Sequence, residues 1–320
     1  MRVFQSAAAF AAARGRGAPP TSVAIGNFDG VHLGHQALLA EARRGVRGHG
    51  QAVALTFYPH PARVLAPAKA PPLIMPLERR LALLADTGID ATVVQPFTRE
   101  LSSVSAEDFI RDVLIRDLAA SAVVVGPDFR FGRGRAGDVQ LLETLGRALS
   151  LSVSVIAPVT VGTTADSQRC SSTRIRQLVE AGDVRGARWL LGRPFELEGA
   201  VVQGAARGRT IGFPTANLVP ETELRPAVGI YAARAVVLDG PASGTTHLAA
   251  VSIGRNPTFE AQGAPVTVEA HLLDFSGDLY GRRLRLELWH RLRDEQKFES
   301  VEALIAQIAA DVAGVRALMS

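Results

Sequence analysis

Two histidines with a spacing suited to phosphate chemistry follow the short apolar strand predicted at 23–25. His32 and His35 are three residues apart, so both imidazoles project from the same face of the first turn of a helix. Gly34 lies between them and adds no side chain, which lets a planar base or a phosphate come close. Because free N–H groups at a helix start attract anions, the pair predicts a site for the charge that develops when pyrophosphate leaves an α-phosphate.

A second set of polar residues occurs in the second half of the chain. Thr215 and Asn217 are two residues apart, so in an extended segment their oxygen atoms face the same way and suit Mg²⁺. Taken alone, the pair is better explained by an Asx-type turn beside a proline. The segment 266–275 alternates like a strand, and Glu269 lies on the face opposite to its apolar residues. The residues alone leave open whether this glutamate is simply solvated.

The elements that must position the histidines alternate between strand and helix. The histidines lie between an apolar strand and a helix predicted over 33–44, and later helices are indicated by a capping box at Ser105 and Asp108 and a start at Asp138. The predicted strands are 23–25, 53–55, 91–94, 122–125 and 151–156. This alternation predicts an α/β fold with a doubly wound parallel sheet, whose ligands bind at the carboxyl ends of the strands.

The pattern changes after a predicted helical segment over 173–191. Short alternating segments separated by Gly and Pro then predict an antiparallel β-barrel or sandwich: 232–238, 248–253, 266–273 and 284–289. A C-terminal helix is predicted from a stripe of apolar residues: Val301, Leu304, Ile305, Ile308 and Val312. We place the domain boundary so that the predicted domains are 1–185 and 186–320.

Composition restricts the kind of chemistry. Lysine occurs only at Lys69 and Lys297, and neither follows a G-x-x-x-x-G, so the chain has no P-loop. The single cysteine, Cys170, excludes an internal disulfide and predicts a reducing, cytoplasmic location. No apolar run approaches the roughly 20 residues that span a bilayer. The pI of about 9.8 reflects a bias toward arginine more than an affinity for phosphate-rich ligands.

Four motifs between residues 26 and 176, in order, resemble the FMN adenylyltransferase module of the nucleotidylyltransferase superfamily: 26–35, 56–61, 125–132 and 171–176. The resemblance implies that the FMN phosphate attacks the α-phosphorus of ATP. It implies that His32 and His35 stabilise the triphosphate. The remaining implied ATP-binding residues of this module are Gly26, Asn27, Asp29, Gly34, Ser171, Thr173 and Arg176. Phe57, Asp128 and Phe129 are predicted to form the flavin pocket, with core packing as the alternative for the two phenylalanines.

Six motifs of the second half resemble riboflavin kinase: 208–217, 226–232, 253–259, 269–275, 278–281 and 293–298. That family has a compact antiparallel β-barrel with a C-terminal helix. The resemblance implies that Glu269 is the general base for the riboflavin 5′-hydroxyl, and that Thr215 and Asn217 hold the Mg²⁺ that bridges the ATP phosphates. Arg293 is predicted to contact the flavin. The implied ATP-binding residues of this module are Gly208, Arg209, Gly212 and Pro214.

The whole chain is thus similar to the bacterial bifunctional riboflavin kinase/FAD synthetase family, with riboflavin, FMN and ATP as substrates. A flavin- or nucleotide-binding regulator without catalysis is the alternative, but it predicts decay at the polar site residues, which are present. An RNA- or tRNA-binding module predicts a lysine-rich signature loop or a basic aromatic strand, and neither occurs. We therefore expect no nucleic-acid or membrane partner, and the sequence leaves the oligomeric state open.

Overall fold

The computed structural model of the chain consists of two compact units. The first comprises residues 1–72 and 77–170, and the second comprises residues 73–76 and 171–320. The structure describes residues 1–15, 17–46, 49–163, 167–204, 207–255 and 266–319. The motif at 253–259 therefore lies partly outside the described residues.

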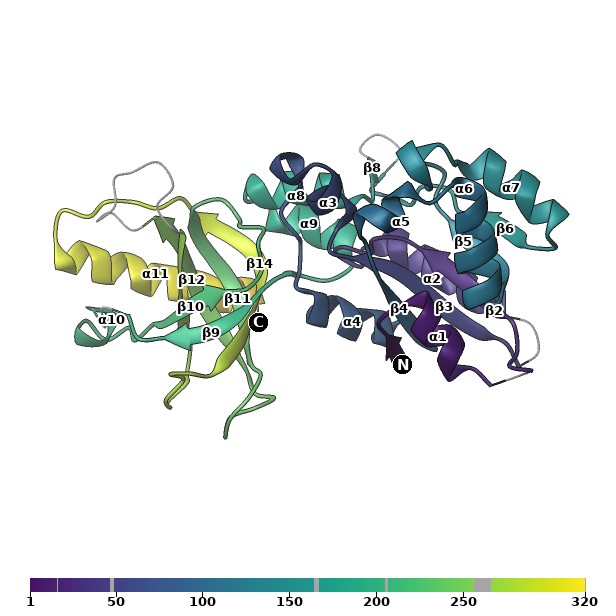
Figure 1. Ribbon diagram of the computed structural model, residues 1–320. Helices are drawn as coiled ribbons and strands as arrows, with labels where there is room; N and C mark the ends of the chain where they lie inside the picture. The colour runs from purple at the N-terminus through teal and green to yellow at the C-terminus, as the bar shows by residue number, and fades with distance from the viewer. Residues whose placement is uncertain (16, 47–48, 164–166, 205–206, 256–265, 320) are drawn as a thin grey trace. The chain divides into compact units, whose positions relative to one another are not determined.

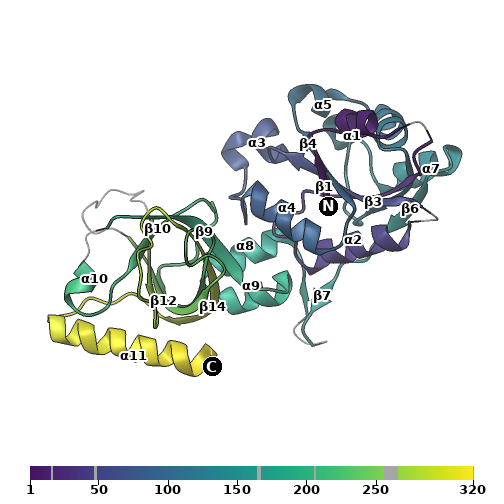
Figure 2. The same ribbon diagram turned by 90° about the horizontal axis from the view of Figure 1, so that it is seen from below.

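A six-stranded parallel sheet forms the centre of the first unit and has helices on both faces (Figures 1 and 2). The strand order is β1-β4-β3-β2-β5-β6. The strands are β1 (Arg2–Phe4), β2 (Thr21–Ile25), β3 (Gln51–Tyr58), β4 (Ala91–Pro96), β5 (Ala120–Val125) and β6 (Ser152–Val155). The predicted doubly wound sheet is confirmed. Strand β1 escaped the prediction because a three-residue edge strand has too few positions to show a period.

The helices of the first unit follow the strands in alternation. They are α1 (Ala7–Ala13), α2 (Leu33–Arg44), α3 (Pro61–Leu65), α4 (Leu77–Asp86), α5 (Arg99–Ser103), α6 (Ala106–Asp108) and α7 (Val139–Ala148), with 3₁₀ turns η1 (Pro67–Lys69) and η3 (Arg133–Arg135). A small hairpin is formed by β7 (Thr160–Val161) and β8 (Gln168–Arg169).

Strand β2 is buried along its whole length, and its two faces meet different helices. Val23 and Ile25 share a core cluster with Phe10 of α1. Ala24 lies on the opposite face because side chains alternate along a strand, and α2 packs against β2 from that side (Figure 2). The small side chain there allows the helix that carries the two histidines to lie close to the sheet.

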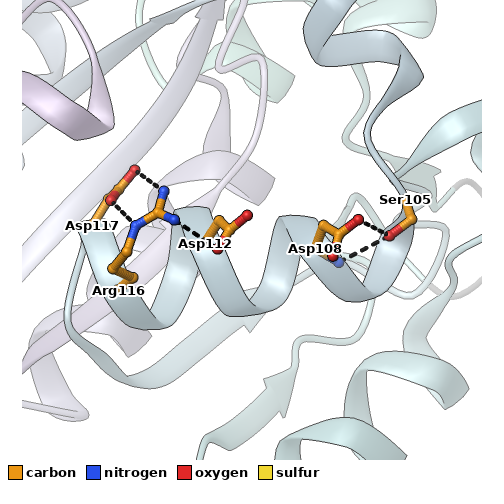
Figure 3. Close-up of polar contacts among 5 residues, drawn as sticks. All are labelled: Ser105, Asp108, Asp112, Arg116 and Asp117. Atoms are coloured by element: carbon orange, nitrogen blue, oxygen red, sulfur yellow. Dashed lines mark hydrogen bonds and ion pairs between the residues drawn. The ribbon is translucent and has the colours of Figure 1, made fainter.

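The N-cap role of Ser105 in the predicted capping box is confirmed. Ser105 Oγ accepts a hydrogen bond from the Asp108 backbone N–H at 3.0 Å and donates to the Asp108 carboxylate at 2.7 Å (Figure 3). The helix then widens into a π-helical stretch, η2 (Phe109–Asp117), on which Arg116 bonds Asp112 and Asp117 at 2.7 Å each (Figure 3). The polar contacts lie on the solvent face, so the apolar side of this helix is left to pack on the core.

The second unit is a closed antiparallel barrel with the strand order β10-β13-β12-β11-β14-β9. Its strands are β9 (Phe195–Val202), β10 (Ala216–Pro220), β11 (Gly229–Val237), β12 (Thr246–Arg255), β13 (Val266–Leu272) and β14 (Arg283–Arg293). Its helices are α8 (Ser172–Glu180), α9 (Val184–Leu191), α10 (Arg207–Thr210) and α11 (Val301–Met319). Closure of β9 onto β10 decides between the barrel and the sandwich that the strand pattern left open.

The helical segment predicted over 173–191 is two helices. Gly182 adopts a left-handed φ of 79°, and the Asp183 carboxylate caps α9 through the Gly186 N–H at 2.8 Å. A glycine in this conformation ends a helix because residues with a Cβ rarely adopt it. The helical spacing of apolar residues continues across the turn at Gly182, because α8 and α9 each bury one apolar face.

Helix α11 is fixed to the barrel by a buried ion pair. The Asp311 carboxylate accepts two hydrogen bonds from Arg293 of β14, at 2.9 and 2.7 Å, and a third from Gln307 at 3.0 Å. The predicted apolar stripe of this helix is only partly buried, and Val301 is 54% exposed. Within the described residues, no helix is long and apolar enough to cross a membrane.

We expect Asp311→Ala to lower the free energy of unfolding of the barrel by about 3 kcal/mol, because it leaves a largely buried guanidinium without its carboxylate. Urea unfolding followed by circular dichroism measures the loss. Arg316→Gln is the matched control, since it removes the exposed Arg316–Asp274 pair from the same helix. Equal losses in the two variants would contradict a special role for the buried pair.

Candidate active sites

The loop between β2 and α2 has an unusual backbone. Phe28 and Val31 adopt positive φ values of 49° and 38°, and Gly30 adopts 93°. A left-handed conformation costs a residue with a Cβ roughly 1–2 kcal/mol. Two such residues, with Gly30 between them, therefore form a turn that must be held by contacts from outside the loop.

Those contacts come from buried side chains beneath the loop. The Asn27 carbonyl accepts hydrogen bonds from Arg80 Nη1 of α4 and from Thr56 Oγ1 of β3, each at 3.1 Å. Arg80 Nη2 lies 3.8 Å from Asp29 Oδ1, and both side chains are 1% exposed. Asp29, which the sequence predicts at the ATP site, thus faces the interior. Its predicted role in binding ATP directly stays a prediction.

The two predicted histidines lie together at the start of α2. Their rings stack with centroids 3.6 Å apart and an angle of 19° between planes. His32 is also the N-cap of α2, because its Nδ1 accepts the His35 backbone N–H at 3.3 Å. A neutral imidazole that accepts at Nδ1 carries its proton at Nε2, so His32 is set up as a hydrogen-bond donor through Nε2. The spacing predicted the shared face, but it did not predict the cap.

Gly34 packs closely against the His32 ring. A Cβ at this position would lie 3.1 Å from the His32 ring and 3.5 Å from the Cys170 carbonyl oxygen. Burial raises the pKa of the Cys170 thiol above its ordinary value, although a hydrogen bond from the Gly34 backbone acts in the opposite direction. The thiol is therefore neutral at pH 7 and acts as a packing group beside Gly34. Gly26 is similarly close-packed, against the Phe28 ring at 3.2 Å.

His60 is a contact of this loop that the sequence analysis missed. Its Nδ1 accepts the Ala62 N–H at 3.2 Å and caps α3, so its Nε2 carries the proton. Asn27 Nδ2 lies 3.3 Å from that Nε2, so the His60 ring contacts the Asn27 side chain. His60 lies within the predicted motif at 56–61, and this motif was the sequence feature that could have identified it.

The predicted flavin residues have packing partners of their own. Phe57 contacts Phe97 edge to face at 5.9 Å, and Phe129 stacks on Phe131 at 5.2 Å. Both predicted residues are half-buried against the core cluster. Asp128 is exposed and forms an ion pair with Arg169. The two phenylalanine rings therefore pack against the core, which was the alternative to a flavin pocket. Their flavin-binding role stays a prediction.

Ser171, Thr173 and Arg176 lie at the start of α8, at the beginning of the second unit. Ser171 Oγ accepts the Arg174 N–H at 3.2 Å and caps the helix. Thr173 is exposed, whereas Arg176 is 9% exposed. The helix start expected here is confirmed, and the positive end of a helix dipole is a place that favours a phosphate.

In the second unit, the structure brings the three predicted catalytic and metal-binding residues together. Asn217 of β10 lies directly opposite Glu269 of β13 in the antiparallel ladder. Thr215 Oγ1 donates to Glu269 Oε2 at 3.3 Å. A Cβ on Gly204 would lie 2.2 Å from the Asn217 amide, so the glycine leaves room for that side chain. A hydroxyl, an amide and a carboxylate thus converge from two adjacent strands.

The segment before Thr215 is tightly folded. A Cβ on Gly208 would lie 2.3 Å from the Phe213 carbonyl oxygen, and Gly212 has a φ of 87°. His271 Nδ1 lies 2.8 Å from the Pro214 carbonyl oxygen and donates to it. A small cavity of about 80 Å³ opens beside this segment, and it is lined in part by Arg209, Pro214, Thr215, Phe275 and Tyr280. The predicted ATP-binding loop therefore borders a pocket, and His271 is a further residue that holds it.

The donor set suits a divalent cation that shares its ligands with a substrate. Across the described part of the chain, no three His, Cys, Asp or Glu side chains form a metal-binding group. Mg²⁺ commonly takes one or two protein oxygens and completes its octahedron with waters and phosphates. The oxygens of Thr215, Asn217 and Glu269 fit that kind of site.

Arg293, predicted to contact flavin, is engaged elsewhere. Besides its two bonds to Asp311, its Nη1 donates to the Asp294 carbonyl at 2.9 Å. Its side chain is 16% exposed. The structure thus shows a link between barrel and helix, and the flavin contact stays a prediction.

We expect His32→Ala to lower the free energy of unfolding by about 1 kcal/mol, because α2 loses its N-cap. His32→Asn should retain most of that stability, since asparagine is among the best N-cap residues. Thermal unfolding of the two variants side by side measures the difference. Equal stability of the alanine and asparagine variants would show that the cap contributes nothing.

Comparison with known proteins gives matches over most of the chain. Residues 16–174 match the FAD synthetase family and residues 191–319 match the riboflavin kinase family. A "Bifunctional riboflavin kinase/FMN adenylyltransferase" of Escherichia coli (strain K12) is 38% identical, over 90% of this chain and 89% of that protein. The protein of the same name from Pseudomonas fluorescens is 39% identical, over 92% and 91%.

A solved structure shares the fold over the whole chain. It is that of a protein named Macrolide-efflux Protein, from Streptococcus pneumoniae, with a TM-score of 0.82, 31% identity and 98% coverage of both chains. Together with the two family matches and the identity to the bifunctional enzymes, this shows that the chain belongs to the bifunctional riboflavin kinase/FMN adenylyltransferase family.

Proposed function

We propose that this chain phosphorylates riboflavin with ATP to give FMN, and then adenylylates FMN with a second ATP to give FAD and pyrophosphate. The observation that carries the proposal is the convergence of Thr215, Asn217 and Glu269 on neighbouring strands within the riboflavin kinase match. The stacked His32 and His35 at a helix start support the second reaction in the same way, within the FAD synthetase match.

In the kinase reaction, Glu269 takes the proton of the riboflavin 5′-hydroxyl while that oxygen attacks the γ-phosphorus of ATP. The bond from the γ-phosphorus to the β,γ-bridging oxygen breaks, and ADP leaves with the electron pair. An alcohol needs such a base because it is a poor nucleophile while protonated. Thr215 donates to the carboxylate and orients it. Thr215 and Asn217 would hold Mg²⁺, which when bound neutralises charge on the transferring phosphoryl group.

In the adenylyltransferase reaction, an FMN phosphate oxygen attacks the α-phosphorus of ATP and pyrophosphate leaves. The nucleophile is already an anion, so the chain needs no base here and contributes positioning and charge stabilisation. His32 donates from Nε2 to the triphosphate, and His35 lies beside it. The groups proposed to bind the phosphates at the start of α8 are Ser171, Thr173 and Arg176.

The proposal also covers the domain bounds, the substrates, the metal ion and the compartment. We assign 1–185 to the adenylyltransferase and 186–320 to the kinase, with riboflavin, FMN and ATP as small-molecule substrates and the cytoplasm as the compartment. ATP is used with a divalent metal in both families, and Mg²⁺ is the ion proposed here. A regulator that has lost catalysis is not favoured, because the polar groups of both sites are present: His32 stacks on His35, and Thr215 is bonded to Glu269.

We expect Glu269→Gln to lower kcat for riboflavin phosphorylation by about 10²–10⁴-fold, the usual contribution of a general base. The same protein should still convert supplied FMN into FAD. Chromatography of the products from riboflavin, FMN and ATP measures both steps. Glu302→Gln, an exposed change on α11 of the same unit, is the control. Normal FMN formation by Glu269→Gln would refute the assignment of the base.

We expect His32→Asn to lower kcat for FAD formation by about 10²–10³-fold, the usual effect of losing one donor to a developing anion. FMN formation should be unchanged. His32→Ala should abolish FAD formation as well, but the asparagine variant keeps the helix cap and so separates chemistry from folding. The exposed His49→Asn is the control. Unchanged FAD output from His32→Asn would remove His32 from the mechanism.

A further inference from the structure

We propose that Arg80 is a positioning residue for FMN adenylylation, which holds the loop 26–32 in the one conformation that presents His32 and His35 to ATP. The proposal rests on the function proposed above for the histidine site. Arg80 itself contacts neither histidine in the bonds described here: it acts through Asn27 and Asp29.

The burial of Arg80 requires an explanation. Its side chain is 1% exposed, and it is the largest of the fully buried side chains among the described residues. Arginine is almost never fully buried unless it is paired. Here its fork reaches two groups of one loop, since Nη1 donates to the Asn27 carbonyl at 3.1 Å and Nη2 lies 3.8 Å from Asp29 Oδ1. An arginine that only stabilised its own helix, α4, would not need to reach this loop.

The two groups that Arg80 contacts lie at the start of the left-handed turn. Asn27 and Asp29 flank Phe28, and Gly30 and Val31 follow, so three positive φ values come at or directly after the anchored positions. His32 is the next residue. Thr56 supplies a second donor to the Asn27 carbonyl and fixes the same point from β3. The turn is therefore held from the interior directly before His32, whose own side chain is buried.

This arrangement predicts a particular kinetic signature. Without its anchor, the loop spends only a fraction of its time in the competent conformation, and the apparent affinity for a ligand of that conformation falls by the same fraction. Saturating ATP selects the competent loop and restores the rate. The loss of a positioning residue therefore raises KM for ATP, while kcat at saturation is largely recovered. The loss of a group that touches the transition state lowers kcat instead.

Arg80→Met tests the proposal in the full chain, with FMN and ATP supplied. We expect KM for ATP to rise roughly ten-fold or more, with kcat for FAD formation at saturating ATP within about three-fold of the unchanged protein. Riboflavin phosphorylation by the same preparation is the internal control for the amount of intact protein. Arg147→Met, an exposed arginine of α7, is the matched control and should change neither activity.

Two milder variants cover the case in which Arg80→Met does not fold. Arg80→Lys keeps a cation near Asp29, but a single ammonium cannot reproduce the two-pronged contact. Thr56→Val removes the other donor to the Asn27 carbonyl and leaves Arg80 in place. Both should raise KM for ATP in the same direction and by a smaller factor.

Two outcomes would overturn the role of Arg80. A fall in kcat at unchanged KM for ATP would mean a smaller active fraction or a direct part in the chemistry, and unchanged constants in all three variants would mean no role. A chain that makes no FAD from FMN before any substitution would instead overturn the proposed function. The two failures are therefore distinguishable.

Discussion

The pairing of neighbouring strands is the constraint on which both sites depend. In a parallel sheet, the carboxyl ends of all strands lie along one edge, so Asn27 after β2 meets Thr56 near the end of β3. In the barrel, antiparallel register sets Asn217 directly opposite Glu269. A shift of one residue in that register would turn the side chains of one strand to the other face of the sheet and separate the amide from the carboxylate. The hydrogen-bond pairing of the strands thus determines which polar side chains lie close enough to act together.

Several residues of these sites serve structure and chemistry through the same atoms. His32 caps α2 through Nδ1, and this bond determines that the proton is carried by Nε2. The Thr215 hydroxyl donates to Glu269 and is also one of the oxygens suited to a cation. His271 holds the segment before Thr215 through the Pro214 carbonyl. In each case one hydrogen bond stabilises the local fold and also orients the polar group. No additional residue is then needed to orient that group.

The two units carry different polar groups because the proposed reactions use different nucleophiles. A hydroxyl must lose its proton, and the barrel places the half-buried carboxylate of Glu269 beside Thr215, one of the proposed cation ligands. An FMN phosphate needs no base, and near the histidine pair the acidic Asp29 is fully buried beside Arg80. Because Asp29 is buried and lies beside Arg80, its carboxylate adds no negative charge to the surface where a triphosphate would bind. The acidic side chain of this loop therefore contacts Arg80 inside the first unit.

The sequence by itself determined the two folds and the neighbourhood of each site. Strand and helix periods persist over many residues, and the spacing of His32 and His35 decides that they share one helix turn. Only the tertiary structure decided that Arg80 supports the loop 53 residues before it, and that Asp29 is buried. In the sequence, Arg80 is an ordinary charge in an amphipathic helix, since no local pattern encodes which distant backbone group a long side chain will reach. Local periodicity thus predicts elements, whereas long-range contacts select the partners of individual polar groups.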